Sequence, residues 1–270
     1  MKRSICLALV VLASSVALPA AAAGSRSRAT TRFLGLDPHG PLARVNSKGA
    51  LSEPEDTACR TWGDAKGSWN ALDALGKVVG TARVSGAERY DVTNCDELEL
   101  ERASGERGVG IFVRGTYKAV DLSRFKPPKR AMARLARLIE RRDARLPAAQ
   151  NKAPDAPLRA RMFGFRKGDD APIVVVGGRA LSVFRLERGR WHKLYEELPC
   201  EPKDTKAQCA ATVWSPDIYK TVSALDMNGD GQIEIVVHEA FVDAYDDVTL
   251  TPDGKGGFKR VESGIHGAFA

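Results

Sequence analysis

The sequence predicts a mainly β protein of blade-like, four-stranded antiparallel units, with one connecting helix near residues 128–145. Three observations predict this class. Short runs rich in Val, Ile and Tyr, bounded by Gly, Pro, Asn and Asp, recur from residue 77 onward, and such runs are typical of β-strands. The second half of the chain contains two similar strand–turn–strand segments. One segment has apolar residues at helical spacing.

The first 23 residues have the order of a secretory signal. A basic pair, Lys2 and Arg3, precedes an apolar stretch from Ile5 to Leu18, and a run of small residues ends at Ala23. A basic start, a short apolar core and a small-residue cleavage site mark exported proteins. A membrane span would need about 20 apolar residues. We therefore expect cleavage near residue 23, a periplasmic or extracellular protein, and no transmembrane segment.

The charge balance is mildly positive. The chain has 41 Lys and Arg residues against 34 Asp and Glu residues, a net charge of +7, and loss of Lys2 and Arg3 with the signal lowers it by two. Such a charge favours solubility and loose contact with acidic surfaces. It does not indicate nucleic acid as a partner.

Two regions precede the helix. Residues 24–56 are rich in Arg, Ser, Gly and Pro without clear periodicity, so we expect a poorly ordered lead-in, with at most short extended pieces. Residues 57–126 form the predicted N-terminal β region, in which residues 77–84, 88–92 and 108–113 have the composition of strands.

Residues 127–157 are predicted to form a basic helix and a Pro-rich linker. Met132, Leu135, Leu138 and Ile139 recur at spacings of three, three and one, which places them on one apolar stripe. The other faces carry basic residues, namely Lys129, Arg130, Arg134, Arg137, Arg141, Arg142 and Arg145. Two interpretations of these faces remain open: a solvated surface, which we favour because no aromatic residue interleaves, or a surface that binds nucleic acid or anionic lipid.

The C-terminal β repeat region, residues 158–270, contains the two similar segments. Residues 165–176 align without gaps with residues 226–237, and two further strand candidates follow each copy, at 180–186 and 190–196 and at 246–251 and 258–261. Repeated units of four short strands are typical of propeller blades. Two copies do not close a ring. The alternatives are an incomplete propeller, completed from residues 59–125, or a β-sandwich whose copies share only a hairpin.

The second copy contains a candidate calcium loop. Asp226, Asn228 and Asp230 alternate along the chain, a glycine follows them, and Glu234 returns as the next strand begins. Ca²⁺ takes six to eight oxygen ligands, and this spacing offers them from side chains and the Gln232 carbonyl, with water completing the set. The alternative is an ordinary turn rich in Asp and Asn, without metal.

This pattern, D-x-N-x-D-G-x-x-E followed by an Ile/Val strand, resembles the calcium loops of FG-GAP or VCBS-type repeats, as in the propeller blades of integrin α-subunits. The resemblance covers residues 219–258 and implies a loop between two strands, with Glu234 as closing ligand. It departs from an EF-hand, because Val237 stands at the twelfth position. It extends weakly to residues 161–196, where Phe165, Lys167 and Ile173 replace ligands. Only Asp169 keeps a ligand position there.

The cysteines favour disulfide bonds. Cys6 leaves with the signal, and the mature chain keeps Cys59, Cys95, Cys200 and Cys209. An even number of cysteines in an exported protein predicts two disulfides. Three pairings are possible, and the pairing that closes two local loops joins Cys59 to Cys95 and Cys200 to Cys209. The alternatives are four free thiols or a zinc site, and the close C-x-x-C spacing that brings metal thiolates together is absent.

No catalytic motif is found in the sequence. His238 and Glu239 resemble the start of the zinc motif H-E-x-x-H, but the second histidine is missing, and no nucleophile elbow or phosphate loop occurs. An acidic cluster could bind a second ion or supply paired carboxylates, but a solvated strand edge is the favoured interpretation. Its members are Glu239, Asp243, Asp246 and Asp247.

Several aromatic residues could stack on a sugar or grip a partner, although core packing is the favoured interpretation. They are Trp62, Trp69, Trp191, Tyr195 and Trp214.

These observations lead to one main functional hypothesis and two alternatives. The main hypothesis is an exported, Ca²⁺-stabilised binding or scaffold protein, whose partner is an unknown protein or a surface glycan. The first alternative is a secreted hydrolase that uses the carboxylates near Glu239, with calcium as structural support. The second is a protein that binds anionic surfaces through the Arg-rich helix.

Overall fold

The computed structural model describes ten stretches of the chain. The predicted signal sequence, Cys59, Cys95 and Cys209 lie outside them, so the expectations for these residues remain predictions. The described residues are 31–34, 41–45, 51–52, 66–89, 96–102, 109–146, 156–200, 218–240, 244–261 and 267–268.

The described chain is mainly β, with three antiparallel sheets and one described helix, as the sequence predicts. The first sheet has the strand order β3-β2-β1-β7-β4-β5-β6. Its strands are β1 (Thr31–Leu34), β2 (Pro41–Val45), β3 (Leu51–Ser52), β4 (Gly67–Asp73), β5 (Val78–Arg89), β6 (Asp96–Arg102) and β7 (Val109–Arg114).

Part of the predicted lead-in belongs to this first sheet. Strands β1, β2 and β3 lie within residues 24–56, and their apolar residues Phe33 and Val45 are buried in the core. These strands are of the short extended kind that the sequence allows in the lead-in, and they are too short to show a clear period of two. Strands β4 and β6, by contrast, lie outside the strand candidates of the N-terminal β region. The charges of Asp96–Arg102 obscure the strand pattern of β6.

The two other sheets contain the two aligned copies. The second sheet has the order β12-β11-β10-β9-β8, and the third has the order β13-β14-β15-β16, with β17 also paired to β15. Their strands are β8 (Leu122–Arg124), β9 (Met162–Lys167), β10 (Ile173–Val176), β11 (Leu181–Glu187), β12 (Arg190–Glu197), β13 (Tyr219–Leu225), β14 (Glu234–Ala240), β15 (Ala244–Pro252), β16 (Phe258–Val261) and β17 (Gly267–Ala268).

Each copy therefore folds as four consecutive antiparallel strands, β9 to β12 and β13 to β16, at the positions that the sequence indicates. The first hairpins of the two copies differ in register. Ile173 lies opposite Phe165 in one, whereas Glu234 lies opposite Leu225 in the other. The connection in the second copy is therefore one residue longer than a gap-free alignment implies. That extra residue belongs to the candidate calcium loop.

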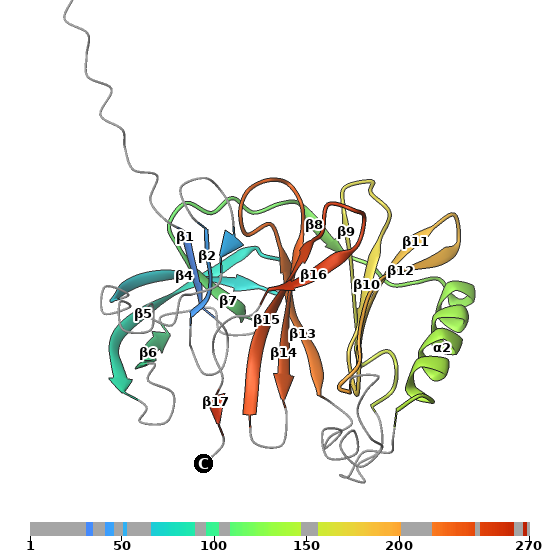
Figure 1. Cartoon of the computed structure of the whole chain (residues 1–270). Coiled ribbons are helices and arrows are strands. Elements are labelled where there is room, and N and C mark those ends of the chain that lie inside the picture. Colours follow the sequence, from blue (N-terminus) through green and yellow to red (C-terminus); the bar gives the residue numbers. More distant parts are fainter. Residues whose placement is uncertain are drawn as a thin grey trace, which may run out of the picture.

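The three sheets stack face to face, with the third sheet between the first and the second (Figure 1). Alternate residues of β14 show this. Ile235 and Val237 pack in the core shared with the second sheet, whereas Val236 packs in the core shared with the first. On β10, Val175 faces the third sheet and Val174 faces the helix. The third sheet therefore packs against a neighbour on each face, and the order of the sheets in space differs from their order in the chain.

Helix α2 (Lys129–Asp143) forms the outermost layer, against the second sheet (Figure 1). Leu135 and Ile139 are buried as predicted, and Trp191 Nε1 donates a hydrogen bond of 2.8 Å to the carbonyl oxygen of Ala131. Two prolines precede the helix, which suits its N-terminus because Pro lacks the N–H that a helix interior requires. The apolar stripe anchors the helix. Most of the basic residues are exposed, although Arg134 bonds to the Gly189 carbonyl oxygen and Arg145 pairs with Glu196 of β12, both at 2.8 Å.

Arg142 is a correction to the predicted solvated face. Its side chain is only 2 % exposed, because it lies one turn beyond Ile139 and two turns beyond Leu135, on the same face of the helix. Its guanidinium contacts Asp143 at 2.7 Å and Ser182 Oγ at 3.1 Å. Burial lowers the pKa of Arg142, while the charge of Asp143 acts in the opposite direction. The buried Arg142 guanidinium is thus paired with Asp143 at the contact between α2 and the second sheet.

Candidate functional site

The predicted calcium loop connects β13 to β14, the first hairpin of the third sheet, in which β13 is an edge strand. Gly229 and Gly231 have φ angles of 77° and 85°, a left-handed conformation that L side chains rarely adopt. Glycine at these two positions lets the chain reverse twice within the loop. The apolar residues beside the loop, Leu225 and Met227, are buried in the core shared with the first sheet.

Two predicted ligands, Asp226 and Glu234, are buried at the base of the loop. Asp226 Oδ1 accepts a hydrogen bond of 2.7 Å from Gly229 N, and its Oδ2 accepts one of 2.8 Å from Gly231 N. Glu234 Oε2 accepts a bond of 2.8 Å from Met227 N. Backbone N–H groups of the loop therefore donate to both carboxylates, and these bonds hold the loop in its turn. Asp226 and Glu234 are 4 % and 2 % exposed, respectively.

The other predicted ligands lie at the outer part of the loop. Asn228 Oδ1 accepts a hydrogen bond from Asp230 N at 3.0 Å, and Asp230 Oδ1 accepts one from Gln232 N at 2.7 Å. Asp230 Oδ2 accepts bonds of 3.2 Å from the side-chain amides of Asn228 and Gln232. Among the described residues, no group of three or more His, Cys, Asp or Glu side chains is arranged to hold a metal ion. The loop brings Asp226 and Glu234 together, but Asp230 bonds to amides instead.

The base of the loop lacks compensating positive charge. Within the described stretches, neither Asp226 nor Glu234 forms an ion pair with Lys, Arg or His. Burial raises the pKa of Glu234 to about 8; the Met227 N–H acts in the opposite direction, and the charges of Asp226 and Asp230 add to the rise. Burying an unpaired charge is costly. Hard oxygen donors with excess negative charge fit a cation such as Ca²⁺.

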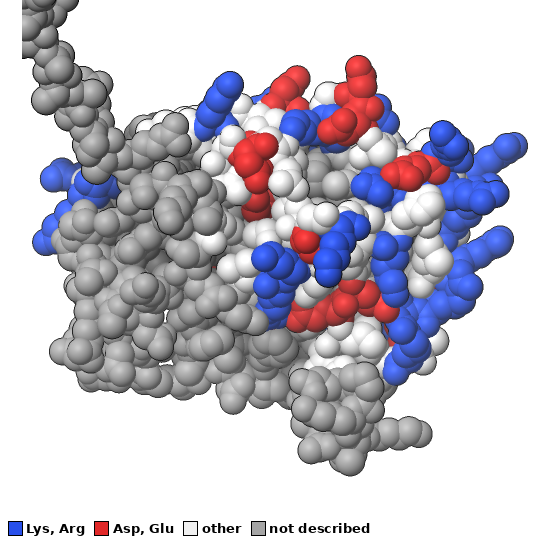
Figure 2. All heavy atoms as spheres, turned by 45° about the horizontal axis from the view of Figure 1, so that its top comes forward, with Lys and Arg blue, Asp and Glu red and all other residues white. Residues whose placement is uncertain are grey.

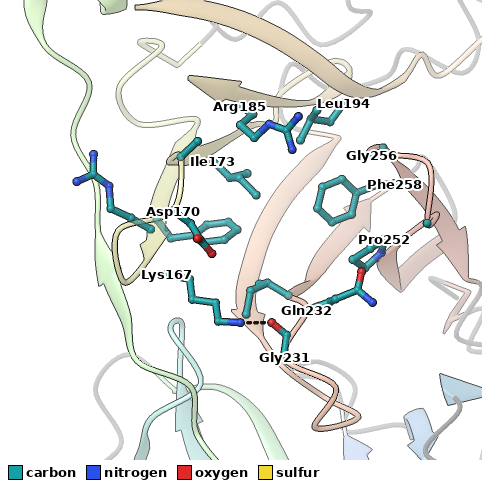
Figure 3. Close-up of a pocket in the computed structure, with 16 residues that line it drawn as sticks. Lys167, Asp170, Ile173, Arg185, Leu194, Gly231, Gln232, Pro252, Gly256 and Phe258 are labelled. Carbon is teal, nitrogen blue, oxygen red and sulfur yellow. Dashed lines mark hydrogen bonds between the residues drawn. The ribbon is translucent and has the colours of Figure 1, made fainter. Parts of the chain in front are cut away.

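The degenerate copy has lost the ligand set and packs against the loop. Phe165, at the position equivalent to Asp226, is buried in the core, and Asp169 is exposed. Lys167, equivalent to Asn228, donates a hydrogen bond from Nζ to the Gly231 carbonyl oxygen (Figure 3). The turn of the second sheet therefore contacts the loop of the third sheet, a contact that the sequence did not predict.

The acidic residues near Glu239 do not form the solvated edge that we favoured from the sequence. Glu239 has no exposed surface, and its Oε1 accepts a bond of 2.7 Å from Arg260 Nη1. The same nitrogen contacts Glu197 Oε1 at 2.5 Å. Asp247 is 4 % exposed and lies 2.8 Å from His238 Nδ1. Side chains alternate between the two faces of a strand, and because both faces of the third sheet are covered, Glu239 on β14 and Asp247 on β15 are buried.

Asp243 and the side chain of Asp246 lie outside the described residues. Arg260 and Glu197 were missed, because a single charged residue within a strand pattern carries no sign of its partner in another sheet. The partnership follows from how the second and third sheets pack, which a local pattern does not encode.

The described aromatic residues serve packing. Trp69 is 1 % exposed, and Trp191 packs edge-on against Phe184 with ring centroids 6.4 Å apart. The Tyr195 hydroxyl donates to Glu197 Oε2 at 2.5 Å. Burial raises the pKa of Tyr195, and the hydrogen bond to Glu197 adds to the rise. Trp62 and Trp214 lie outside the described residues.

Cys200 is disulfide-bonded. Its expected partner, Cys209, lies outside the described residues, so the pairing itself remains a prediction.

Comparisons with protein-family models, with curated proteins and with solved structures find no match for this chain. In the described part of the chain, no helix has the combined length and apolar character of a membrane span.

Proposed function

We propose that this chain is an exported, Ca²⁺-stabilised binding or scaffold protein whose loop 226–234 holds the ion. The supporting observation is the pair of buried carboxylates, Asp226 and Glu234, which have backbone amide partners but no ion-pair partner within the described residues. A divalent cation would neutralise this charge with the oxygen ligands that it prefers.

The ion would be held by Asp226, Asn228, Asp230, Glu234 and the Gln232 carbonyl. Asp230 is exposed, and its carboxylate bonds only to amides of the loop. A hydrogen bond to a charged group contributes about 1.5–3 kcal/mol, and bonds of this carboxylate to a metal ion would replace the bonds that it gives up. The residues that would hold the ion are therefore present, and Asp230 can turn toward it by giving up bonds made within the loop alone.

The position of the loop explains what an ion would stabilise. The residues at its start, Leu225 and Met227, pack toward the first sheet, whereas Ile233 at its end packs toward the second. Fixing the loop would fix the middle layer against both neighbours. The expected role of the ion is therefore structural, and the protein would be a rigid support for contacts made elsewhere on its surface.

Thermal melting of metal-free protein with added Ca²⁺ tests this proposal. A ligand at ten to a hundred times its Kd stabilises the folded state by about 1.4–2.7 kcal/mol, which raises the midpoint by a few degrees in a protein of this size. Asp230→Ala should abolish this increment. Asp169→Ala, the equivalent position in the degenerate copy, should retain it. A midpoint that responds to neither Ca²⁺ nor chelator would refute the proposal.

The geometry does not favour the hydrolase alternative. Glu239, the carboxylate that it invokes, is fully buried and bonded to Arg260, so a substrate would not reach it without opening the core. Turnover of polysaccharide or ester substrates that disappears in Glu239→Gln would reverse this conclusion, provided that the variant melts as the parent does.

A second candidate function, binding to an anionic surface, is supported by the outer face of α2. Figure 2 shows Lys and Arg gathered on the side of the molecule where α2 lies in Figure 1. Arg134, Arg137 and Arg141 are exposed there, although Arg134 also bonds to the Gly189 carbonyl oxygen at 2.8 Å. The apolar stripe is buried against the sheet, so contact with a membrane would be electrostatic and would weaken with salt.

Retention on anionic vesicles at low salt tests this second candidate. Replacing Arg134, Arg137 and Arg141 together by Ala should reduce retention. A matched triple variant on the first sheet should not, because its residues, Lys66, Lys77 and Arg83, are also exposed but lie away from α2. Equal retention of the two triple variants would dismiss this candidate.

A further inference from the structure

A pocket with a volume of about 350 Å³ opens between the second and third sheets, beside the candidate calcium loop. The β9–β10 and β15–β16 turns and the calcium loop surround it, and β11 and β12 contribute one side chain each (Figure 3). Ligand pockets are commonly about 300–1,000 Å³ and lie where separate structural layers meet. The size and position of this pocket are therefore those of a small-molecule site.

The floor of the pocket is apolar and reaches solvent. Ile173, Leu194 and Phe258 pack on the core between the two sheets but remain partly exposed, and all three line the pocket. Beneath them, Phe165 and Ile233 are buried. A ligand in the pocket would thus contact apolar side chains that belong to the core between the second and third sheets. Apolar surface gains about 25 cal/mol per Å² when it is removed from water.

Charged side chains stand around this floor. Lys167 and Arg185 bring positive charge and Asp170 brings negative charge (Figure 3). Arg185 is partly balanced by Glu187, whose carboxylate lies 2.5 Å away, and both side chains are well exposed. Lys167 donates to a neutral carbonyl, so its charge is not balanced by that contact. The rim is therefore positive near Lys167 and carries one opposing carboxylate.

Arg166 also lines the pocket, but its guanidinium lies over the ring of Phe125, 5.3 Å from the centroid. Phe125 lines a different cavity, so the charge of Arg166 is directed away from this site. The charged side chains that face the pocket are therefore Lys167, Arg185 and Asp170, and because Glu187 partly balances Arg185, the positive charge available to a ligand is mainly that of Lys167.

We propose that this pocket binds a small organic monoanion with an aromatic or aliphatic body. The body would cover Ile173, Leu194 and Phe258, and the anionic group would lie near Lys167. Asp170 would disfavour dianions. The proposal does not depend on calcium, because the side chains that carry it come from the second sheet and from β16. One wall of the pocket, however, is formed by residues 231–233 of the loop, so an ion there would stiffen the wall.

The test uses anilinonaphthalene sulfonate, an aromatic monoanion whose fluorescence rises in apolar sites, titrated into the full mature chain with Ca²⁺ and again with chelator. We expect saturable binding at one site under both conditions. Phenylnaphthylamine, a neutral analogue, should bind more weakly. Binding of the neutral probe as tight as that of the anion would overturn the proposal. A Ca²⁺ effect on melting without saturable probe binding would also overturn it, while leaving the proposed function intact.

The half-buried Lys167 and the exposed Asp170 give opposite expectations. Lys167→Met should weaken binding of the anionic probe by roughly two- to fivefold, the range of a solvent-exposed charge pair. Asp170→Asn should tighten it by roughly the same factor. Lys220→Met and Asp169→Asn are matched controls, because both residues are exposed and neither lines the pocket. Equal affinities in all four variants would overturn the proposal.

The probe could instead bind to another exposed apolar surface. Among the described residues, the exposed large apolar side chains are Val78 and Val79, at 53 % and 39 %. Val78→Thr should therefore leave the fluorescence titration unchanged. Loss of the signal in that variant, with full signal in Lys167→Met, would place the probe on the first sheet and refute the pocket.

Discussion

Replacing Arg260 by Met should destabilise the fold strongly, because one guanidinium serves two carboxylates from different sheets. Arg260 Nη1 lies 2.7 Å from Glu239 Oε1 on β14 and 2.5 Å from Glu197 Oε1 on β12. Glu239 has no exposed surface, and Glu197 and Arg260 are 20 % and 23 % exposed. The change would leave two carboxylates close together in the interface between the second and third sheets.

The expected loss in the free energy of unfolding is roughly 2–4 kcal/mol. Removing one partner of a fully buried pair costs about 3–5 kcal/mol, and the partial exposure of Arg260 and Glu197 lowers this value through solvent screening. A loss of this size corresponds to a fall in the melting midpoint of roughly 4–15 °C in a protein of this length. Urea unfolding measures the free energy, and thermal melting provides a second readout.

Lys193→Met is the matched control, because Lys193 also pairs with a carboxylate of β12 but is 51 % exposed. It should cost no more than about 1 kcal/mol. Adding Glu239→Leu to Arg260→Met should recover part of the loss, since apolar groups can replace a buried pair. If Arg260→Met costs no more than Lys193→Met, or if the second change brings no recovery, the cluster does not hold the two sheets together.

Three further changes test the packing. In Gly177→Ala, the added Cβ would lie 2.1 Å from the Tyr219 carbonyl oxygen, so we expect a loss of at least about 1–3 kcal/mol in urea unfolding; an unchanged urea midpoint would contradict this close approach of backbones. Leu135→Ala should cost about 2–5 kcal/mol, and a smaller loss would mean that α2 is held mainly by its polar contacts. Mass mapping without reduction should recover a peptide that links Cys200 to Cys209, whereas a link from Cys200 to another cysteine would refute the local pairing.

Local pattern was enough to predict the helix and the hairpins of the second half. The spacing of Leu135 and Ile139 fixes one face of α2, and the Val/Ile runs at 173–176 and 235–237 form strands where expected. Local pattern did not predict which faces meet. Val236 and Ile235 are equally apolar, yet they pack toward different sheets. The stacking order of the sheets decides which neighbour each of these two residues contacts, and the local sequence does not contain that order.

The loop was also predictable in part. Its spacing located it between two strands, and its glycines indicated the turn. The depth of Glu234 and the outward bonding of Asp230 were not predictable, because they depend on which strand residues pair across the hairpin. The one-residue difference in register from the degenerate copy brings Glu234 opposite Leu225. That pairing starts β14 at the glutamate and places its carboxylate beneath the loop.

The middle position of the third sheet has a consequence for the order of folding during synthesis. Residues 218–261 leave the ribosome after both other sheets, yet they supply the layer that packs between them. Until they arrive, apolar faces that include Val175 on one sheet and Ile111 on the other have no cover, and such surfaces promote aggregation. Nascent chains that stop before residue 218 should therefore require chaperone protection. The strands of the third sheet complete both interfaces when they fold between the other two sheets.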